Sequence, residues 1–143
     1  MDSINHYDFK AFPKVELHRH LEGSIRLDTL NEIARSFGLP FSTNTTLKQK
    51  VQMQPDEDFS MQNFLAKFQT LREFYLSPEI IQRIAYETIA DAALDGIRYV
   101  EMMFTPVALA RVRSYPLDEI IDWVLTSAQQ AAKDYHIIAR YII

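Results

Sequence analysis

The chain has 143 residues, enough for one ordinary domain, and its 48% hydrophobic and 24% charged residues are typical of soluble globular proteins. A formal net charge of −4 offers no basic footprint for nucleic acid, and the absence of cysteine excludes disulfides and thiolate metal sites. The cysteine-ligated zinc deaminases that act on nucleic-acid bases are excluded for the same reason. No run approaches the roughly 18 apolar residues of a membrane span. Residues 1–12 show no signal-peptide pattern, so we expect a cytoplasmic protein.

The first half of the chain begins with a strand pattern and continues with helical ones. Residues 15–21 alternate as a short strand does, and residues 28–37 have helical spacing that stops at Gly38. Residues 43–58 are polar and give no clear prediction. The next helical pattern places five apolar side chains on one face: Met61, Phe64, Leu65, Phe68 and Leu71.

The second half alternates between long helices and strands. Ser77-Pro78 is a helix start, with a capping residue followed by proline at the first helical position, and this helix ends near Gly96. Residues 97–105 predict a strand closed by Pro106. Pro116 opens another long helix, and residues 136–143 predict a last strand.

Strands that alternate with helices predict parallel βαβ units, and right-handed crossovers place the three strands side by side. A (β/α)₈ TIM barrel needs about 250 residues. The chain has the length of roughly three of its eight strands with their helices. We therefore predict an α/β fold that is part of such a barrel, with residues 1–143 as one segment of a single domain.

Two histidines stand at the end of the first predicted strand. Because side chains alternate along a strand, His18 and His20 share a face and Arg19 points the other way. Two imidazoles so placed can reach one metal ion at about 2.0–2.1 Å, at the strand end where barrel enzymes carry their chemistry. Two imidazoles bonded to the backbone would explain the pair equally simply. Glu16, expected on the same face, fits either a group that orients an imidazole or a salt-bridge partner lower in the barrel.

Several stretches resemble the adenosine deaminase family in the right order. Residues 13–24, PKVELHRHLEGS, are similar to its first-strand signature, and residues 64–68, FLAKF, to its lid helix. Residues 83–87, RIAYE, resemble the long helix that follows, and residues 95–106 resemble the second strand. The resemblance covers nearly the whole chain from Pro13 and implies the N-terminal part of the barrel.

The resemblance implies that His18 and His20 are ligands of a catalytic zinc ion. In the family, zinc activates a water that attacks C6 of a purine, and ammonia leaves. A third histidine ligand, a catalytic glutamate, a further histidine and paired aspartates belong to motifs that residues 1–143 do not contain. We therefore expect no catalytic acid in this chain, no deaminase activity from residues 1–143 alone, and a structural role for His136.

The resemblance also implies a substrate site. Glu22 matches a carboxylate that bonds the ribose end of the nucleoside, and Gly23 fits a turn that a ligand or another backbone approaches closely. The lid-helix residues would form an apolar gate over the purine, although core burial explains the same stripe: Met61, Phe64, Leu65 and Phe68. Thr105 matches a small polar position near the ligand, although strand propensity alone would explain it.

The chain departs from the family pattern at two positions. Glu22 stands where adenosine deaminases often have aspartate, and in this it resembles relatives that act on adenine, aminofutalosine or modified nucleotides. Met103 stands where many members have arginine, which leaves Glu101 without its expected partner.

The leading hypothesis is zinc-dependent hydrolytic deamination of a purine nucleoside or base, of the adenosine-to-inosine type, with a small-molecule purine and water as partners and neither nucleic acid nor membrane. The alternatives are an adenine, aminofutalosine or modified-nucleotide deaminase, and another metal hydrolase on the same barrel. A further alternative is an inactive truncated relative that binds only zinc or a protein. Three strands with open edges should oligomerise or aggregate, so a monomer of 16.7 kDa would argue against an incomplete barrel.

Overall fold

The computed structural model describes residues 9, 11–41 and 44–143. Most of the stretch searched for a signal peptide, and Thr43 at the start of the polar segment, lie outside the described residues. Within the described part of the chain, no helix is both long enough and apolar enough to cross a membrane.

Three parallel strands form one sheet in the order β1-β2-β3. They are β1 (Lys14–His20), β2 (Ile97–Met103) and β3 (Ile138–Ile142), and β2 lies in the middle. The predicted side-by-side parallel arrangement is therefore confirmed.

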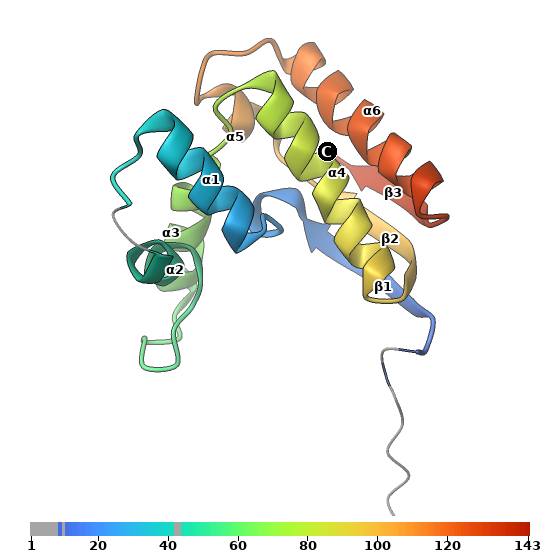
Figure 1. The fold of residues 1–143 in the computed structure, drawn as a ribbon, viewed down its shortest axis with the longest axis horizontal. Helices are drawn as coiled ribbons and strands as arrows, with labels where there is room; N and C mark the ends of the chain where they lie inside the picture. Colours follow the sequence, from blue (N-terminus) through green and yellow to red (C-terminus); the bar gives the residue numbers. More distant parts are fainter. Residues whose placement is uncertain (1–8, 10, 42–43) are drawn as a thin grey trace, which may run out of the picture.

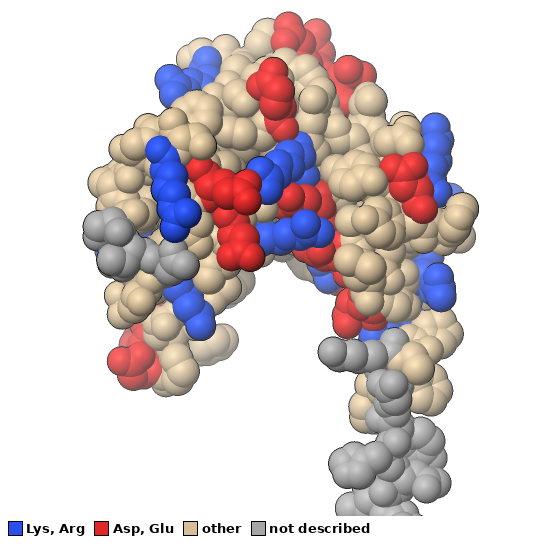
Figure 2. All heavy atoms as spheres, in the orientation of Figure 1, with Lys and Arg blue, Asp and Glu red and all other residues tan. Residues whose placement is uncertain are grey.

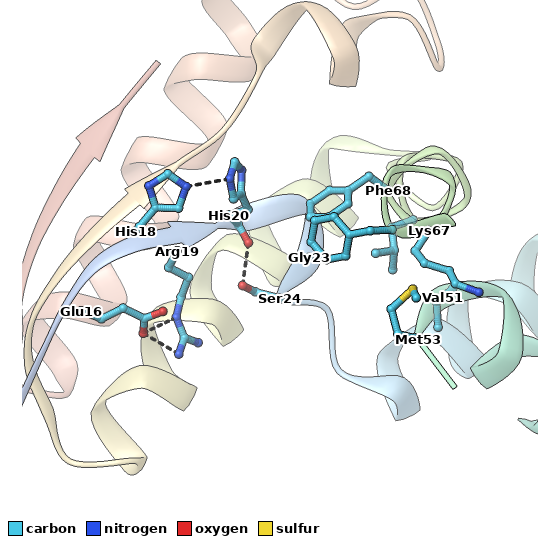
Figure 3. Close-up of a pocket in the computed structure, with 12 residues that line it drawn as sticks. Glu16, His18, Arg19, His20, Gly23, Ser24, Val51, Met53, Lys67 and Phe68 are labelled. Carbon is cyan, nitrogen blue, oxygen red and sulfur yellow. Dashed lines mark hydrogen bonds and ion pairs between the residues drawn. The ribbon is translucent and has the colours of Figure 1, made fainter. Parts of the chain in front are cut away.

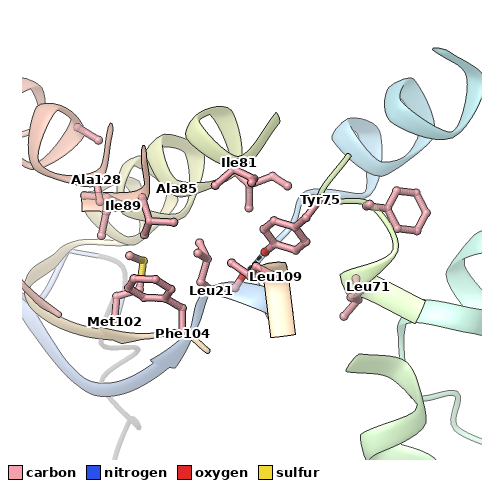
Figure 4. Packing of buried hydrophobic residues seen from close by; sticks show 14 of the residues in the cluster. Leu21, Leu71, Tyr75, Ile81, Ala85, Ile89, Met102, Phe104, Leu109 and Ala128 are labelled. Carbon is pink, nitrogen blue, oxygen red and sulfur yellow. Dashed lines mark hydrogen bonds between the residues drawn. The ribbon is translucent and has the colours of Figure 1, made fainter. Parts of the chain in front are cut away.

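Two long helices, α4 (Pro78–Leu94) and α6 (Leu117–Asp134), lie next to each other over one face of the sheet (Figure 1). The start of α4 follows the prediction, because Ser77 Oγ accepts the Ile80 N–H at 3.3 Å and Pro78 has no N–H that would need an acceptor. Side chains from the sheet and from both helices meet in the core (Figure 4). Ile89 of α4, Met102 of β2 and Ala128 of α6 are fully buried there.

A helical excursion separates β1 from α4. It runs through the 3-10 turn η1 (Leu21–Gly23), α1 (Leu27–Phe37), α2 (Asn44–Val51) and α3 (Met61–Arg72). Gly38 ends α1 at φ +63°, a left-handed conformation that glycine adopts at little cost, as predicted for a stop.

Acidic and basic side chains meet where α1 faces α4 (Figure 2). Arg26 pairs with Asp91 at 2.6 Å, and the Thr29 hydroxyl donates to Glu87 at 2.7 Å. Because Thr29 and Glu87 are both buried, this contact fixes α1, and with it the start of the excursion, against α4.

The structure differs from the predicted elements mainly at strand ends and in two short helices, and Leu21, predicted as the last residue of the first strand, belongs to η1. Strand β2 ends at Met103, and Pro106–Ala110 forms a short helix, α5, where only a stop was predicted. Proline at the first helical position and an extended Thr105 before it explain this helix. The polar segment contains α2, and β3 begins only at Ile138 because His136 occupies a left-handed turn at φ 53°.

We expect Ile89→Ala to lower the free energy of unfolding by about 2–5 kcal/mol, because it opens a cavity between α4 and the sheet. Urea unfolding followed by circular dichroism measures this change. The matched control is Leu94→Ala on the same helix, where the side chain is 71% exposed and the change should stay within about 0.5 kcal/mol. Equal effects of the two substitutions would contradict the packing described here.

Candidate functional site

The histidine pair lies at the carboxyl end of β1 with both rings on one side of the strand (Figure 3). The Nε2 atoms of His18 and His20 are 3.1 Å apart, and both side chains are exposed. Arg19 points to the opposite side of the strand. The predicted common face of the two histidines is confirmed.

Glu16 does not share that face, so the expectation for it is wrong. The register between β1 and β2 shifts after Glu16, since Glu16 pairs with Val100 while Arg19 pairs with Met102. Three steps along β1 thus match two steps along β2, which is a bulge and reverses the alternation. Glu16 Oε2 therefore accepts the Arg19 Nε–H at 2.8 Å, as the salt-bridge alternative required, and does not orient an imidazole.

The spacing of the two imidazoles suits a tetrahedral metal ion. Two Zn–N bonds of about 2.0–2.1 Å at a tetrahedral angle hold their nitrogens roughly 3.3 Å apart. The observed separation of 3.1 Å is close to this value. Among the described residues, no third histidine, aspartate or glutamate side chain joins this pair in a group that could hold a metal ion. The described part of the chain therefore offers two metal ligands at this place, His18 and His20.

Glu22, two residues after the pair, is only 1% exposed and so is not a solvated turn residue. Its Oε1 accepts the backbone N–H of Thr105 at 3.2 Å and lies 3.6 Å from the guanidinium of Arg72. The carboxylate thus joins η1 to the start of α5 and to the end of α3. Arg72 is a site residue that sequence reasoning missed, because no local pattern connects it with Glu22.

Tyr75 holds the same turn from the core. Its hydroxyl donates to the carbonyl oxygen of Leu21 at 3.2 Å. Complete burial raises the pKa of Tyr75 well above its ordinary value of 10, and the charge of Glu22 raises it further. Tyr75 therefore remains a protonated donor at neutral pH, and its hydrogen bond to Leu21 holds the turn after His20 against the core.

The apolar face of α3 is exposed, so the core-burial interpretation of this stripe is wrong for three of its residues. Met61, Phe64 and Leu65 are 70%, 43% and 52% exposed. The Phe68 ring lies edge-on to both His20 and Phe64, with ring centroids 5.7 and 5.2 Å apart. The stripe therefore extends from the histidine pair along α3.

Lys67 explains why this face of α3 stays outward. Its side chain is buried, and its ammonium donates to Gln49 O at 2.8 Å and to Glu57 Oε1 at 2.7 Å. These contacts fasten α3 to α2 and to the loop before α3. The sequence signal for this arrangement is the position of Lys67 inside the apolar pattern, although the sequence does not show that this lysine is buried.

Gly23 lies close against the ring of Phe68. A Cβ atom at this position would lie 3.3 Å from the Phe68 ring, closer than most Cβ contacts allow. The close approach predicted for a ligand or another backbone is thus made by an aromatic ring of the stripe. Gly23 also lines a hollow of about 410 Å³ with His18, His20 and Phe68 (Figure 3).

A second cavity, of about 280 Å³, brings most of the predicted substrate residues together. The cavity is lined by His20, Thr105 and Arg72 and by Phe64, Leu65 and Phe68. Met61 does not line this cavity but borders a neighbouring hollow with Leu65. Thr105 contacts Glu22 through its backbone N–H from the position before α5, not as a strand residue.

Two further residues differ from expectation in their surroundings. Glu101 accepts a hydrogen bond from the Tyr99 hydroxyl at 2.7 Å, which raises the pKa of Tyr99, and it faces Arg140 of β3 in register. Glu101 thus lacks the arginine expected as its partner, since position 103 is Met, but it has the Tyr99 hydroxyl as a partner instead. His136 is exposed before the start of β3, at the opposite end of the sheet from the histidine pair.

Comparison with known proteins decides the family. The family model described as adenosine deaminase matches residues 13–143. The chain belongs to the adenosine deaminase family. It is 35% identical over 137 residues to an adenosine deaminase from Klebsiella pneumoniae, a match that covers 92% of this chain and 40% of that protein. The chain thus spans about 40% of the length of the curated relatives that it matches.

Solved structures of the same fold agree with this assignment. An amidohydrolase from Burkholderia ambifaria with bound zinc superposes with a TM-score of 0.79 at 31% identity, over 94% of this chain and 36% of that one. An Arabidopsis protein, ADAL, solved with IMP, superposes with a TM-score of 0.73 at 24% identity, over 93% of this chain and 40% of that one. The open three-stranded sheet with its helices matches the N-terminal part of amidohydrolase TIM-barrel structures.

We expect the stability of the chain to fall on acidification partly through Glu57. The hydrogen bond from Lys67, and then that from the Gln54 N–H, lower the pKa of Glu57 from its ordinary value of 4.5. A carboxyl whose pKa is lowered by folding stabilises the folded state above its unfolded pKa, and this stabilisation is lost as pH falls through the folded value.

Melting temperatures measured between pH 7 and pH 3 test this expectation. Glu57→Gln should show a smaller fall below about pH 4.5 than the unaltered chain. Asp56→Asn, which neutralises the preceding carboxylate, is the control and should follow the unaltered curve. Identical curves for all three proteins would contradict the role given to the Lys67 contact.

Proposed function

We propose that this protein takes part in the zinc-dependent hydrolytic deamination of a purine nucleoside, of the adenosine-to-inosine type, and that His18 and His20 are two of its metal ligands. The single observation that carries the proposal is the 3.1 Å separation of the two Nε2 atoms at the carboxyl end of β1, in a chain of the adenosine deaminase family. Relatives that are 34–35% identical are adenosine deaminases, which supports adenosine as the substrate.

The two imidazoles fit zinc in ligand type and spacing, and each would offer its Nε2 atom. When bound, zinc supplies a Lewis acid that lowers the pKa of water toward about 7. The chain itself supplies the orientation of the ligands. His20 is followed at once by the buried turn η1, and its ring rests against Phe68, so the imidazole has little freedom to turn away.

The remaining predicted residues suit the two ends of a nucleoside. The exposed side chains of Phe64 and Leu65, together with the half-buried ring of Phe68, would cover the flat purine and exclude water near the histidines. The polar end of the cavity, with Thr105 and the carboxylate of Glu22 behind it, would take the ribose. Met61 would contribute only from the neighbouring hollow along α3. Gly23 would contribute by leaving room for the Phe68 ring.

A second candidate is deamination of adenine, aminofutalosine or a modified nucleotide. The observation that favours it is a glutamate at position 22, where the carboxylate reaches one methylene further than the aspartate frequent in adenosine deaminases. ADAL, the Arabidopsis protein with a similar fold, was solved in complex with IMP, a purine nucleotide. An inactive relative that binds only zinc or a protein is the further alternative.

Ammonia release from adenosine tests the proposed activity. We expect it from the zinc-loaded protein that the complete reading frame containing residues 1–143 encodes, and none from residues 1–143 alone. His20→Ala should abolish it, because a metal ligand is lost, and His136→Ala, which alters the exposed histidine at the far end of the sheet, should not. Deamination by the isolated residues 1–143, or retention of activity in His20→Ala, would overturn the assignment.

Zinc affinity provides a readout that does not depend on activity. In competition with a chromophoric chelator, His18→Ala and His20→Ala should each weaken zinc binding by more than about tenfold, since loss of a direct ligand costs at least as much as loss of a supporting group. His136→Ala should leave the affinity unchanged. Equal zinc affinity in all four proteins would remove the histidine pair from the metal site.

A further inference from the structure

The chain contains five methionines and no cysteine, so its sulfur chemistry is that of thioethers alone. The structure places the four described methionines in different surroundings. Met102 is fully buried and Met53 and Met103 are half-buried, whereas Met61 is 70% exposed at the start of α3. Peroxide in solution reaches an exposed thioether far more readily than a buried one. Met61 is therefore the most accessible oxidisable sulfur among the described residues.

The side chain of Met61 stands in a hollow that has room for an added oxygen atom. The hollow has a volume of about 510 Å³, and its lining carries no charge: Met61, Gln62, Leu65, Ala66 and Gln69. The two glutamine carboxamides have N–H groups that can donate to a sulfoxide oxygen, whereas a thioether sulfur is only a weak acceptor. The hollow thus suits the oxidised form of Met61 in both space and polarity.

Leu65 connects this hollow with the cavity that His20 lines. Met61 and Leu65 lie four residues apart on α3, so their side chains are neighbours on one face of the helix. Leu65 lines both the hollow and the cavity beside His20. A sulfoxide next to Leu65 replaces an apolar neighbour with a polar one and brings water to this border. The oxidation state of Met61 therefore changes the apolar wall that the two spaces share.

We propose that Met61 is a redox-sensitive modification site, at which hydrogen peroxide converts the thioether into a sulfoxide and thereby weakens the apolar cover over a bound purine. The effect on purine binding rests on the proposed function, whereas the modification itself does not.

The chemical step balances without any further reactant. A lone pair of Met61 Sδ attacks one peroxide oxygen, the O–O bond breaks, and water leaves. The sulfur is oxidised by two electrons and the peroxide is reduced. Methionine sulfoxide reductases reverse the step, with two thiols oxidised to a disulfide and the oxygen released as water. The site can therefore be switched in both directions.

Peptide mass spectrometry after brief exposure to hydrogen peroxide tests the modification. The sample is the zinc-loaded protein from the complete reading frame that contains residues 1–143, in buffer free of iron and copper, because zinc has no redox chemistry of its own. We expect Met61 to be oxidised at least about tenfold faster than the buried Met102, with Met53 and Met103 between them. Oxidation of Met61 no faster than that of Met102 would overturn the inference.

Kinetics before and after peroxide test the effect on the site. Oxidation should raise KM for adenosine by about threefold to tenfold with little change in kcat, since it weakens an apolar contact and leaves the metal ligands intact. Treatment with methionine sulfoxide reductases should restore KM. Met61→Leu, compared with itself before and after peroxide, should show no response, and Met53→Leu should keep the response. Met61→Gln, which imitates the polarity of the sulfoxide, should have the raised KM without peroxide.

Each remaining outcome also decides the inference. An unchanged KM in protein whose Met61 is fully oxidised, or an equal response in Met61→Leu, would contradict the regulatory effect. If the unaltered protein deaminates no purine, the proposed function fails, and calorimetry with inosine takes the place of kinetics. Weaker inosine binding after oxidation, reversed by the reductases, would then support the inference, and equal binding would overturn it.

Discussion

The candidate site depends on the burial of the turn that follows β1. Leu21 and Glu22 are 0% and 1% exposed, and they come directly after His20. The Tyr75 hydroxyl holds the turn from the core, and the Thr105 N–H holds it from the loop after β2. A histidine pair at the end of an exposed strand would otherwise be free to change its spacing. The buried turn keeps the imidazoles and the carboxylate in one fixed relation.

The same turn links three parts of the chain that lie far apart in sequence. Glu22 reaches Thr105 before α5 and Arg72 at the end of α3. Phe68 of α3 fills the space left by Gly23 and touches His20. The excursion between β1 and α4 is thus attached both at His20 and at the carboxylate of Glu22. This attachment explains how a segment that projects away from the sheet can still line the site (Figure 1).

Ion pairs attach the excursion to the rest of the structure, whereas most of the apolar side chains on α3 do not take part in this attachment. The ion pairs of Arg26 with Asp91 and of Lys67 with Glu57 hold the excursion against α4 and against its own loop. They leave Met61, Phe64 and Leu65 of α3 exposed, while Leu71 at the end of the same stripe is buried in the core. Most of the face of α3 that a periodicity argument assigns to the core is therefore exposed, and Lys67 takes an inward position.

The sequence by itself determined the parallel strand order, the capped start of α4, the common face of His18 and His20 and, through its motifs, the family. These features depend on local rules of alternation, capping and spacing, which act over a few residues. Only the tertiary structure decided that a β-bulge turns Glu16 away from the histidines, that α3 buries Lys67 instead of its aromatic stripe, and that Arg72 meets Glu22. Each of these depends on contacts between segments distant in sequence, whose relative positions no local pattern encodes.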